Sequence, residues 1–251
     1  MENEMLIKSK ANQHGFKASV YANTIQRKVV ISDCANCFTE QELLPFKNWL
    51  EYYFKNNKEL LTIEFVNVFD SLPFVQPKED NFIVNRHFRE NTENPLAKVI
   101  QSLSSFNFLI EGKWGMGVYV SGQFPTIKGN IKTGVIELSG EMYNSYSLDF
   151  MHPFFCWFEK LLQSDIQQTH VYLKIGYLST SYMRRLAEIA TALSSWSART
   201  GKKSLWTWYC LEDDEDTKEW FNDIFKMSDN LSHLKCEAIE LDERQWDKLL
   251  K

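Results

Sequence analysis

Apolar residues in the C-terminal half of the chain recur in the two periods that distinguish helices from strands. Positions three or four residues apart carry apolar side chains over 148–162, which predicts a helix with one apolar face. Residues 170–177 alternate between apolar and polar, which predicts a strand with one face in the core. A second helix is predicted over 181–199, and Gly201 stands where a C-terminal cap belongs. The inward residues of the two helices are Leu148, Met151, Phe155, Phe158 and Leu162, then Met183, Leu186, Ile189, Ala190, Leu193 and Trp196.

The same reading places further elements around this core. A hairpin is predicted from 124–130 and 135–138, and a strand from 205–210. An acidic run follows and leads into a helix with an apolar side, and then come a strand near 234–241 and a short tail helix. The inward residues of the third helix are Trp220, Phe221, Ile224 and Phe225.

The N-terminal half repeats parts of this pattern. The block that starts at Pro45 (Pro-x-x-x-Trp-Leu-Glu) recurs from Pro153, 108 residues later, as Pro-x-x-x-Trp-Phe-Glu. A second block, from Leu96 to Phe106, recurs from Leu186 to Trp196, 90 residues later. The offsets differ by 18 (108 − 90), so the first copy holds extra residues between its blocks. Such self-similarity indicates tandem structural repeats.

We therefore predict an α/β protein made of two tandem repeats, each a small sandwich of a sheet and helices. The first copy is 1–122, with an insert near 73–94, and it lacks the final helix and edge strand of the complete copy, 123–251. Its elements are expected at 40–54 (helix, with Leu43, Phe46, Leu50 and Phe54 inward), 61–68 and 116–120 (strands), and residues 1–15 are expected to be irregular. The insert or the second unit should cover the sheet edge of the first copy.

Composition narrows the class of protein. The chain is 44% hydrophobic, which is enough for real cores, and its net charge of −5 argues against a nonspecific nucleic-acid binder. Five cysteines at irregular positions do not describe a disulfide framework. The acidic N-terminus has no apolar segment typical of a secretory signal, and no run of apolar residues is long enough to span a membrane. We expect a cytoplasmic protein without membrane insertion.

Four patterns that could carry chemistry have simpler explanations. Cys34 and Cys37 have the spacing of a redox or zinc pair, but no second ligand pair completes a metal site. The glycines of 112–117 lead into a strand, whereas a dinucleotide loop opens a helix. The acidic run 212–216 could bind a cation, yet it precedes a helix, where carboxylates favour the dipole. The five histidines form no local cluster. We expect no catalytic residue, metal or cofactor.

The junction between the strand at 170–177 and the following helix offers one more candidate. Ser179 or Thr180 could simply cap the helix. A hydroxyl at this position would also accept a phosphate beside free backbone N–H groups, where negative charge is favoured. Phosphorylation adds about −1.5 to −2 charges, enough to change a docking surface. The first copy has Asp70-Ser71-Leu72-Pro73 at the aligned position and no threonine.

Residues 124–241 resemble the SiaC-type regulatory phosphoproteins of bacterial partner-switching systems. The resemblance rests on an ordered set of motifs: Gly134-Val135-Ile136-Glu137-Leu138-Ser139-Gly140-Glu141-x-Tyr143, Trp157, Tyr177-Leu178-Ser179-Thr180-Ser181, and Trp208-Tyr209 before the acidic run. The family has Asn-Thr-Ser-Ser at its switch, where this chain has Ser179-Thr180-Ser181-Tyr182.

The resemblance implies a non-enzymatic switch, similar in fold to the anti-sigma-factor antagonists of the STAS type. A serine/threonine protein kinase would phosphorylate Thr180, a PP2C-type phosphatase would remove the phosphate, and the unmodified form would dock on an effector, in some systems a diguanylate cyclase. The expected docking surface consists of the flanking residues Tyr177, Leu178, Ser179, Ser181, Tyr182 and Arg185. The competing hypothesis is a structural or scaffolding protein that has lost phosphoregulation, and an unrecognised enzyme is a more distant alternative.

Overall fold

The computed structural model describes residues 3–9, 18–32, 38–57, 59–66, 96, 99–100, 103, 106–110, 125–142 and 147–249. These residues form one ten-stranded sheet whose strands lie side by side in chain order. The strands are β1 (Glu4–Lys8), β2 (Ser19–Asn23), β3 (Lys28–Ser32), β4 (Thr62–Val66), β5 (Asn107–Ile110), β6 (Thr126–Asn130), β7 (Val135–Met142), β8 (Gln168–Leu178), β9 (Lys203–Leu211) and β10 (Leu234–Leu241).

The pairing of neighbouring strands changes direction along the sheet. β1–β2 and β2–β3 are antiparallel, and β3–β4 and β4–β5 are parallel. β5–β6 and β6–β7 are antiparallel again, and the remaining pairs from β7 to β10 are parallel. The order of pairing from β2 to β5 is therefore repeated from β6 to β9. This agrees with a two-copy organisation, while the superposition of the two units, and their boundary near residue 122, stay predictions.

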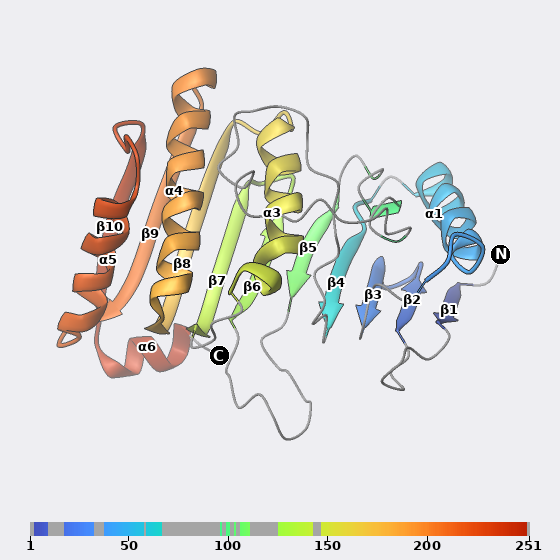
Figure 1. Ribbon diagram of the computed structural model, residues 1–251, viewed down its shortest axis with the longest axis horizontal. Coiled ribbons are helices and arrows are strands. Elements are labelled where there is room, and N and C mark those ends of the chain that lie inside the picture. The colour runs from blue at the N-terminus through green and yellow to red at the C-terminus, as the bar shows by residue number, and fades with distance from the viewer. Residues whose placement is uncertain are drawn as a thin grey trace.

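The helices that connect the strands lie on one face of this sheet (Figure 1). Each parallel connection advances in the same direction along the sheet and joins strands of the same polarity. Right-handed crossovers then place every connecting helix on the same side. The helices are α1 (Leu44–Asn56), α3 (Ser147–Gln163), α4 (Thr180–Thr200), α5 (Glu215–Met227) and the tail helix α6 (Glu243–Leu249).

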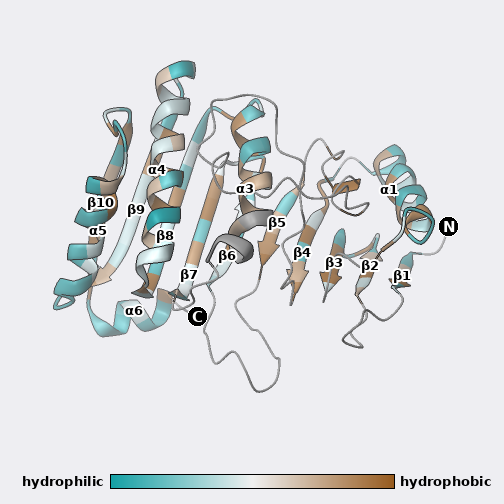
Figure 2. Cartoon of the chain, in the orientation of Figure 1, coloured by the Kyte–Doolittle hydropathy of each residue, from teal (hydrophilic) through white to brown (hydrophobic). Residues whose placement is uncertain are grey.

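The core lies between the helices and the sheet. In β8 the alternate residues Val171, Leu173 and Ile175 are fully buried, while Tyr172 and Lys174 on the opposite face are only half-buried. Apolar residues accordingly concentrate in the strands, and the outer sides of α4, α5 and α6 are hydrophilic (Figure 2). Gly201 ends α4 in the left-handed conformation at φ 69°, which confirms the predicted cap.

The two halves of the chain share this core. Beyond the β5–β6 pairing, the indole Nε1 of Trp157 on α3 donates a 2.6 Å hydrogen bond to the carbonyl oxygen of Phe106. Lys160 Nζ donates to the carbonyl oxygen of Leu103 at 2.9 Å, and the ring of Phe108 on β5 contacts that of Trp157. β6, from the C-terminal half, therefore covers the sheet edge at β5. The insert near 73–94, the other expected cover, lies outside the described residues.

Three details differ from the expectations. Residues 1–15 were expected to be irregular, but five of them form β1, which pairs with β2. The hydrogen bonds to β2 stabilise a strand that this short segment would not form alone. The strand after the second N-terminal block lies at Asn107–Ile110, and the expected position, 116–120, lies outside the described residues. Phe54 was expected to face inward, yet it is 41% exposed, and Trp49 and Tyr53 fill that side of α1 instead.

A close contact in β6 gives a test of the α3 packing. A Cβ added at Gly129 would lie 2.3–2.7 Å from three ring atoms of Trp157, so Gly129→Ala forces the indole or the strand to shift. We expect the free energy of unfolding to fall by about 1–3 kcal/mol, measured by chemical denaturation.

Gly176→Ala in β8 is the matched control. An added Cβ there meets only the side chain of Glu141, at 3.9 Å, and the free energy of unfolding should change by less than about 1 kcal/mol. Equal losses in the two variants would contradict the packing described for Trp157.

Candidate functional site

The carboxyl ends of the parallel strands β7 to β10 meet at one edge of the sheet, the lower edge in Figure 1. The N-terminal end of α4 and the tail helix α6 lie at this same edge. Ligand and partner sites of α/β proteins concentrate at the carboxyl edge, because the connecting loops and helix N-termini gather there. The predicted switch residue therefore lies in the part of the fold best suited to recognition.

Thr180 is the first residue of α4 and is exposed. The backbone N–H of Ser179 donates to Met142 O at the end of β7 (3.0 Å), and its carbonyl oxygen accepts the first helical bond, from Met183 N (3.0 Å). These bonds hold the strand-to-helix turn on both sides. The prediction that Thr180 lies at a helix N-terminus and is accessible is confirmed.

The cap position itself belongs to Ser179, which has an extended backbone at φ −79° and ψ 155°. Its side chain makes no capping hydrogen bond and lies instead 3.0 Å from the hydroxyl of Ser181. No acidic residue occupies the first turn of α4. The positive end of the helix dipole at Thr180 is therefore offset neither by a side-chain cap nor by a carboxylate in that turn.

The residues around Thr180 divide between core and surface. Leu178 is 2% exposed and Tyr182 is fully buried, where burial raises the pKa of the Tyr182 hydroxyl far above its ordinary value. These two side chains cannot contact a partner, so they do not belong to the expected docking surface. Tyr177 is 37% exposed, and its ring meets that of Trp220 on α5 edge-on, with centroids 5.6 Å apart. Trp220 extends the surface beyond the residues that the sequence indicated.

Arg185 also differs from the expectation. Its guanidinium pairs with the carboxylate of Glu188 at 2.7 Å, and both side chains are mostly buried. Burial raises the pKa of Glu188 to about 7, although the nearby Arg185 lowers it. Arg184 is the exposed arginine of this turn. It stands four residues after Thr180 on the same side of α4, and this spacing could have identified it from the sequence.

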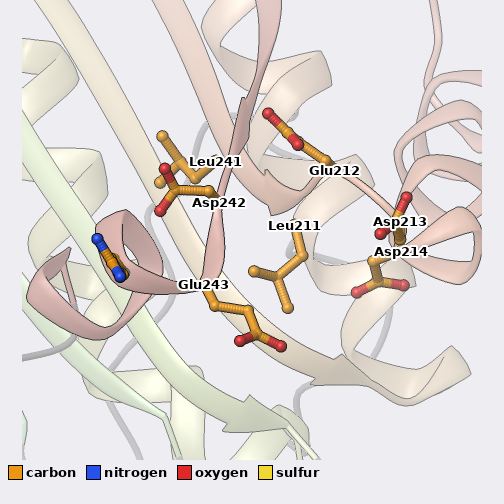
Figure 3. A pocket seen from close by; sticks show the side chains of 8 residues that line it. Leu211, Glu212, Asp213, Asp214, Leu241, Asp242 and Glu243 are labelled. Carbon is orange, nitrogen blue, oxygen red and sulfur yellow. The ribbon is translucent and has the colours of Figure 1, made fainter.

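The acidic run after β9 lies at the same edge of the sheet. Asp214 caps α5, because its Oδ1 accepts from Thr217 N at 3.0 Å and its Oδ2 from Thr217 Oγ1 at 2.5 Å. The interpretation of this run as a helix cap is thus confirmed. The side chains of Glu212 and Glu243 lie around Leu211 in an open hollow between the ends of β9 and β10 (Figure 3).

The described part of the chain contains no metal site, and two of the sequence patterns that could carry chemistry lie outside it. Its His, Cys, Asp and Glu side chains form no group arranged to hold a metal ion. The pair Cys34 and Cys37 and the glycines of 112–117 lie outside the described residues. None of the described helices is both long and apolar enough to cross a lipid bilayer.

Comparison with known proteins places the C-terminal half in a family. Residues 120–240 match the model of the SiaC family regulatory phosphoproteins. This segment belongs to the SiaC family. The match spans just under half of the chain, and residues 1–119 and the tail helix α6 lie outside it.

The solved structures that match are also SiaC proteins. Apo-SiaC from Pseudomonas aeruginosa is 19% identical over 48% of this chain and 98% of its own, with a TM-score of 0.39. SiaC from the same organism, in a crystal structure where it is the activator in complex with the diguanylate cyclase SiaD, is 20% identical over 49% of this chain and 100% of its own, with a TM-score of 0.40. No curated protein matched the sequence. The assignment therefore rests on the family match.

The cap of α5 in the SiaC-family segment can be tested directly. Asp214→Ala removes the acceptor of two hydrogen bonds from Thr217 and should lower the free energy of unfolding by about 0.5–2 kcal/mol. Asp213→Ala changes the net charge equally but leaves the cap in place. Thermal and urea unfolding of the two variants should separate them, and equal stabilities would contradict the capping role of Asp214.

The buried pair on α4 predicts a dependence of stability on pH. The pKa of Glu188 is higher in the folded chain than in the unfolded one, so between these values the folded state binds more protons. Glu188 should therefore make the protein less stable as the pH rises through this window, up to about pH 7. Glu188→Gln should flatten this slope in urea denaturation between about pH 5 and pH 8. Glu219→Gln, at an exposed site on α5, should leave it unchanged.

Proposed function

We propose that this chain is a non-enzymatic regulatory protein whose docking on an effector is switched by reversible phosphorylation of Thr180. The observation that carries the proposal is the exposure of Thr180 at the uncapped N-terminus of α4, within a segment of the SiaC family of regulatory phosphoproteins. A protein kinase needs an accessible hydroxyl, and Thr180 is an exposed residue at the start of a helix.

The site is suited to hold a phosphate without loss of the fold. Phosphothreonine carries about −1.5 to −2 charges, and a negative charge at an exposed helix N-terminus is favoured by about 0.3–1 kcal/mol. Arg184, four residues further on and exposed, provides a positive charge on the same side of the helix. The phosphate therefore changes the surface while the helix stays in place.

The docking surface combines exposed and half-buried polar and aromatic groups. Ser179 and Ser181 flank Thr180, and Tyr177 with Trp220 supplies an aromatic patch beside them. Aromatic side chains of this kind contribute strongly to protein interfaces. A phosphate in the middle of this surface would need to lose its hydration on docking, and the acidic loop after β9 adds further negative charge at the same edge. Phosphorylation should therefore weaken docking.

The proposed partners follow from the family. We propose a serine/threonine protein kinase and a PP2C-type phosphatase that act on Thr180, and a diguanylate cyclase as the effector, the class of enzyme that P. aeruginosa SiaC accompanies as activator. If Thr180 is never phosphorylated, the competing function is a structural or scaffolding module built on the same surface.

The first test maps the modification. The chain is expressed in its native host, and the phosphorylation site is located by mass spectrometry of the intact protein and its peptides. We expect one phosphate on Thr180 that disappears in Thr180→Ala and persists in Ser181→Ala, the matched hydroxyl one residue away. A phosphate that stays in Thr180→Ala would assign the switch to another residue.

The second test measures docking on a diguanylate cyclase of the host. Thr180→Ala should bind as tightly as the unmodified protein, whereas the phosphorylated protein should bind at least about tenfold more weakly. Thr180→Asp should fall between them, because aspartate carries one charge and fewer acceptors. Melting temperatures of all forms should stay close together. Equal affinities throughout would mean that Thr180 only begins the helix.

A further inference from the structure

The strand β1 stands at one end of the sheet and presents an apolar residue to solvent. Within the described residues, β2 is the strand that pairs with it, and its other edge faces away from the sheet. Glu4, Leu6 and Lys8 are exposed, and Leu6 is 57% exposed. An edge strand with an exposed apolar centre is a template for pairing with another strand.

The hydrogen bonds to β2 show which backbone groups of β1 remain at the outer edge. Thr24 N donates to Asn3 O at 2.8 Å, and Ser9 N donates to Ala18 O at 2.9 Å. In an antiparallel pair, only alternate residues exchange hydrogen bonds with the neighbouring strand. Since Asn3 and Ser9 face β2, Met5 and Ile7 do so as well, and the N–H and C=O groups of Glu4, Leu6 and Lys8 point outward.

We propose that a second copy of this chain binds at this edge through antiparallel pairing of β1 with the partner's β1, around a two-fold axis at Leu6. The outward groups of Leu6 then bond to those of the partner's Leu6. Glu4 lies opposite the partner's Lys8, and Lys8 lies opposite the partner's Glu4, each pair exchanging backbone hydrogen bonds. The strand sequence Glu-Met-Leu-Ile-Lys is complementary in charge to itself in this arrangement alone.

The side chains agree with this register on both faces of the sheet. On the face opposite the helices, each Glu4 carboxylate lies opposite a Lys8 ammonium group of the other copy. The two Leu6 side chains lie between these two ion pairs. On the helix face, Met5 lies opposite the partner's Ile7, and both residues pack against the core in the single chain. A two-fold axis at Met5 or Ile7 instead would place Leu6 opposite Glu4 or Lys8 and leave the charges unmatched. Cross-strand pairs of opposite charge stabilise antiparallel sheets, and like charges destabilise them.

The symmetry of this contact closes the assembly at two chains, because the same edge is used by both copies. β1 is seven strand spacings from β8, roughly 34 Å at about 4.8 Å per spacing, so the contact leaves the Thr180 site free. The proposal is thus independent of the phosphorylation switch. Because the contact involves little more than one short strand from each copy, the dimer should dissociate on dilution.

Sedimentation of the full-length chain over a range of concentrations tests the proposal. We expect a reversible monomer–dimer equilibrium. In a dimer of Lys8→Glu or of Glu4→Lys, like charges face each other at both of the positions where Glu4 and Lys8 pair. Each substitution should therefore raise the dissociation constant at least about tenfold. An equimolar mixture of the two variants should associate again, because opposite charges then face each other in the mixed dimer.

A backbone variant checks the edge itself. Leu6→Pro removes an outward N–H but no bond to β2, so it should abolish the dimer, while Leu6→Val keeps the N–H and should leave the dimer in place. Melting temperatures confirm that the variants are folded. Because Glu4 also accepts a 2.8 Å bond from Asn23 Nδ2, a loss of stability in Glu4→Lys would leave Lys8→Glu and Leu6→Pro to decide. A monomeric wild type, a dimer that survives Leu6→Pro, or a mixture that stays monomeric would each overturn the proposal.

Discussion

The antiparallel pairing of β5 with β6 is the contact on which the organisation of this protein depends. It joins two successive sets of strands into one sheet, so that neither set has a free edge at the junction. The bond from Trp157 to the Phe106 carbonyl and the contact of its ring with Phe108 place α3 over this junction. β6 is antiparallel to both β5 and β7, so β5 and β7 run in the same direction. The helices of both halves therefore lie on the same face of the sheet.

That arrangement also determines where the candidate switch lies. Parallel strands that share a polarity end at the same edge, and the helix that follows β8 begins there with Thr180 exposed. Ser179 leaves the helix without a side-chain cap, while α5 has a complete one from Asp214. The N-terminus of α4 therefore still attracts a negative charge. The N-terminus of α5 is already paired with the carboxylate of Asp214.

The continuous sheet has a consequence at its far end. The family match begins at residue 120, just before β6, so the N-terminal strands extend the sheet beyond the matched segment on that side. The extension covers β6 with β5 and, among the strands that the structure describes, makes β1 the outermost one, whose charges are arranged symmetrically around Leu6. The additional half therefore changes which strand lies outermost at this side of the sheet. It does not alter the carboxyl ends of β7 to β10, where Thr180 lies.

Most of the C-terminal elements could be predicted from the sequence, because their apolar positions repeat with a period that only one element type satisfies. The predicted strand over 234–241 and helix over 181–199 correspond to β10 and α4 within a residue or two. Gly201 and Thr180 were also placed correctly, because caps and helix starts depend on local backbone chemistry. The family of residues 120–240 was likewise readable from an ordered set of motifs.

Other features depended on contacts between distant residues. Leu178 and Tyr182 are buried and Phe54 is exposed, because neighbouring elements decide which side of each turn is covered. Arg185 is mostly buried in its ion pair with Glu188, because burial depends on the elements packed around the helix. Five residues at the N-terminus form a strand only because β2 lies beside them. The sequence by itself determined most of the C-terminal elements and the position of Thr180. The tertiary structure decided which side chains surround Thr180, because burial is a property of the packed sheet.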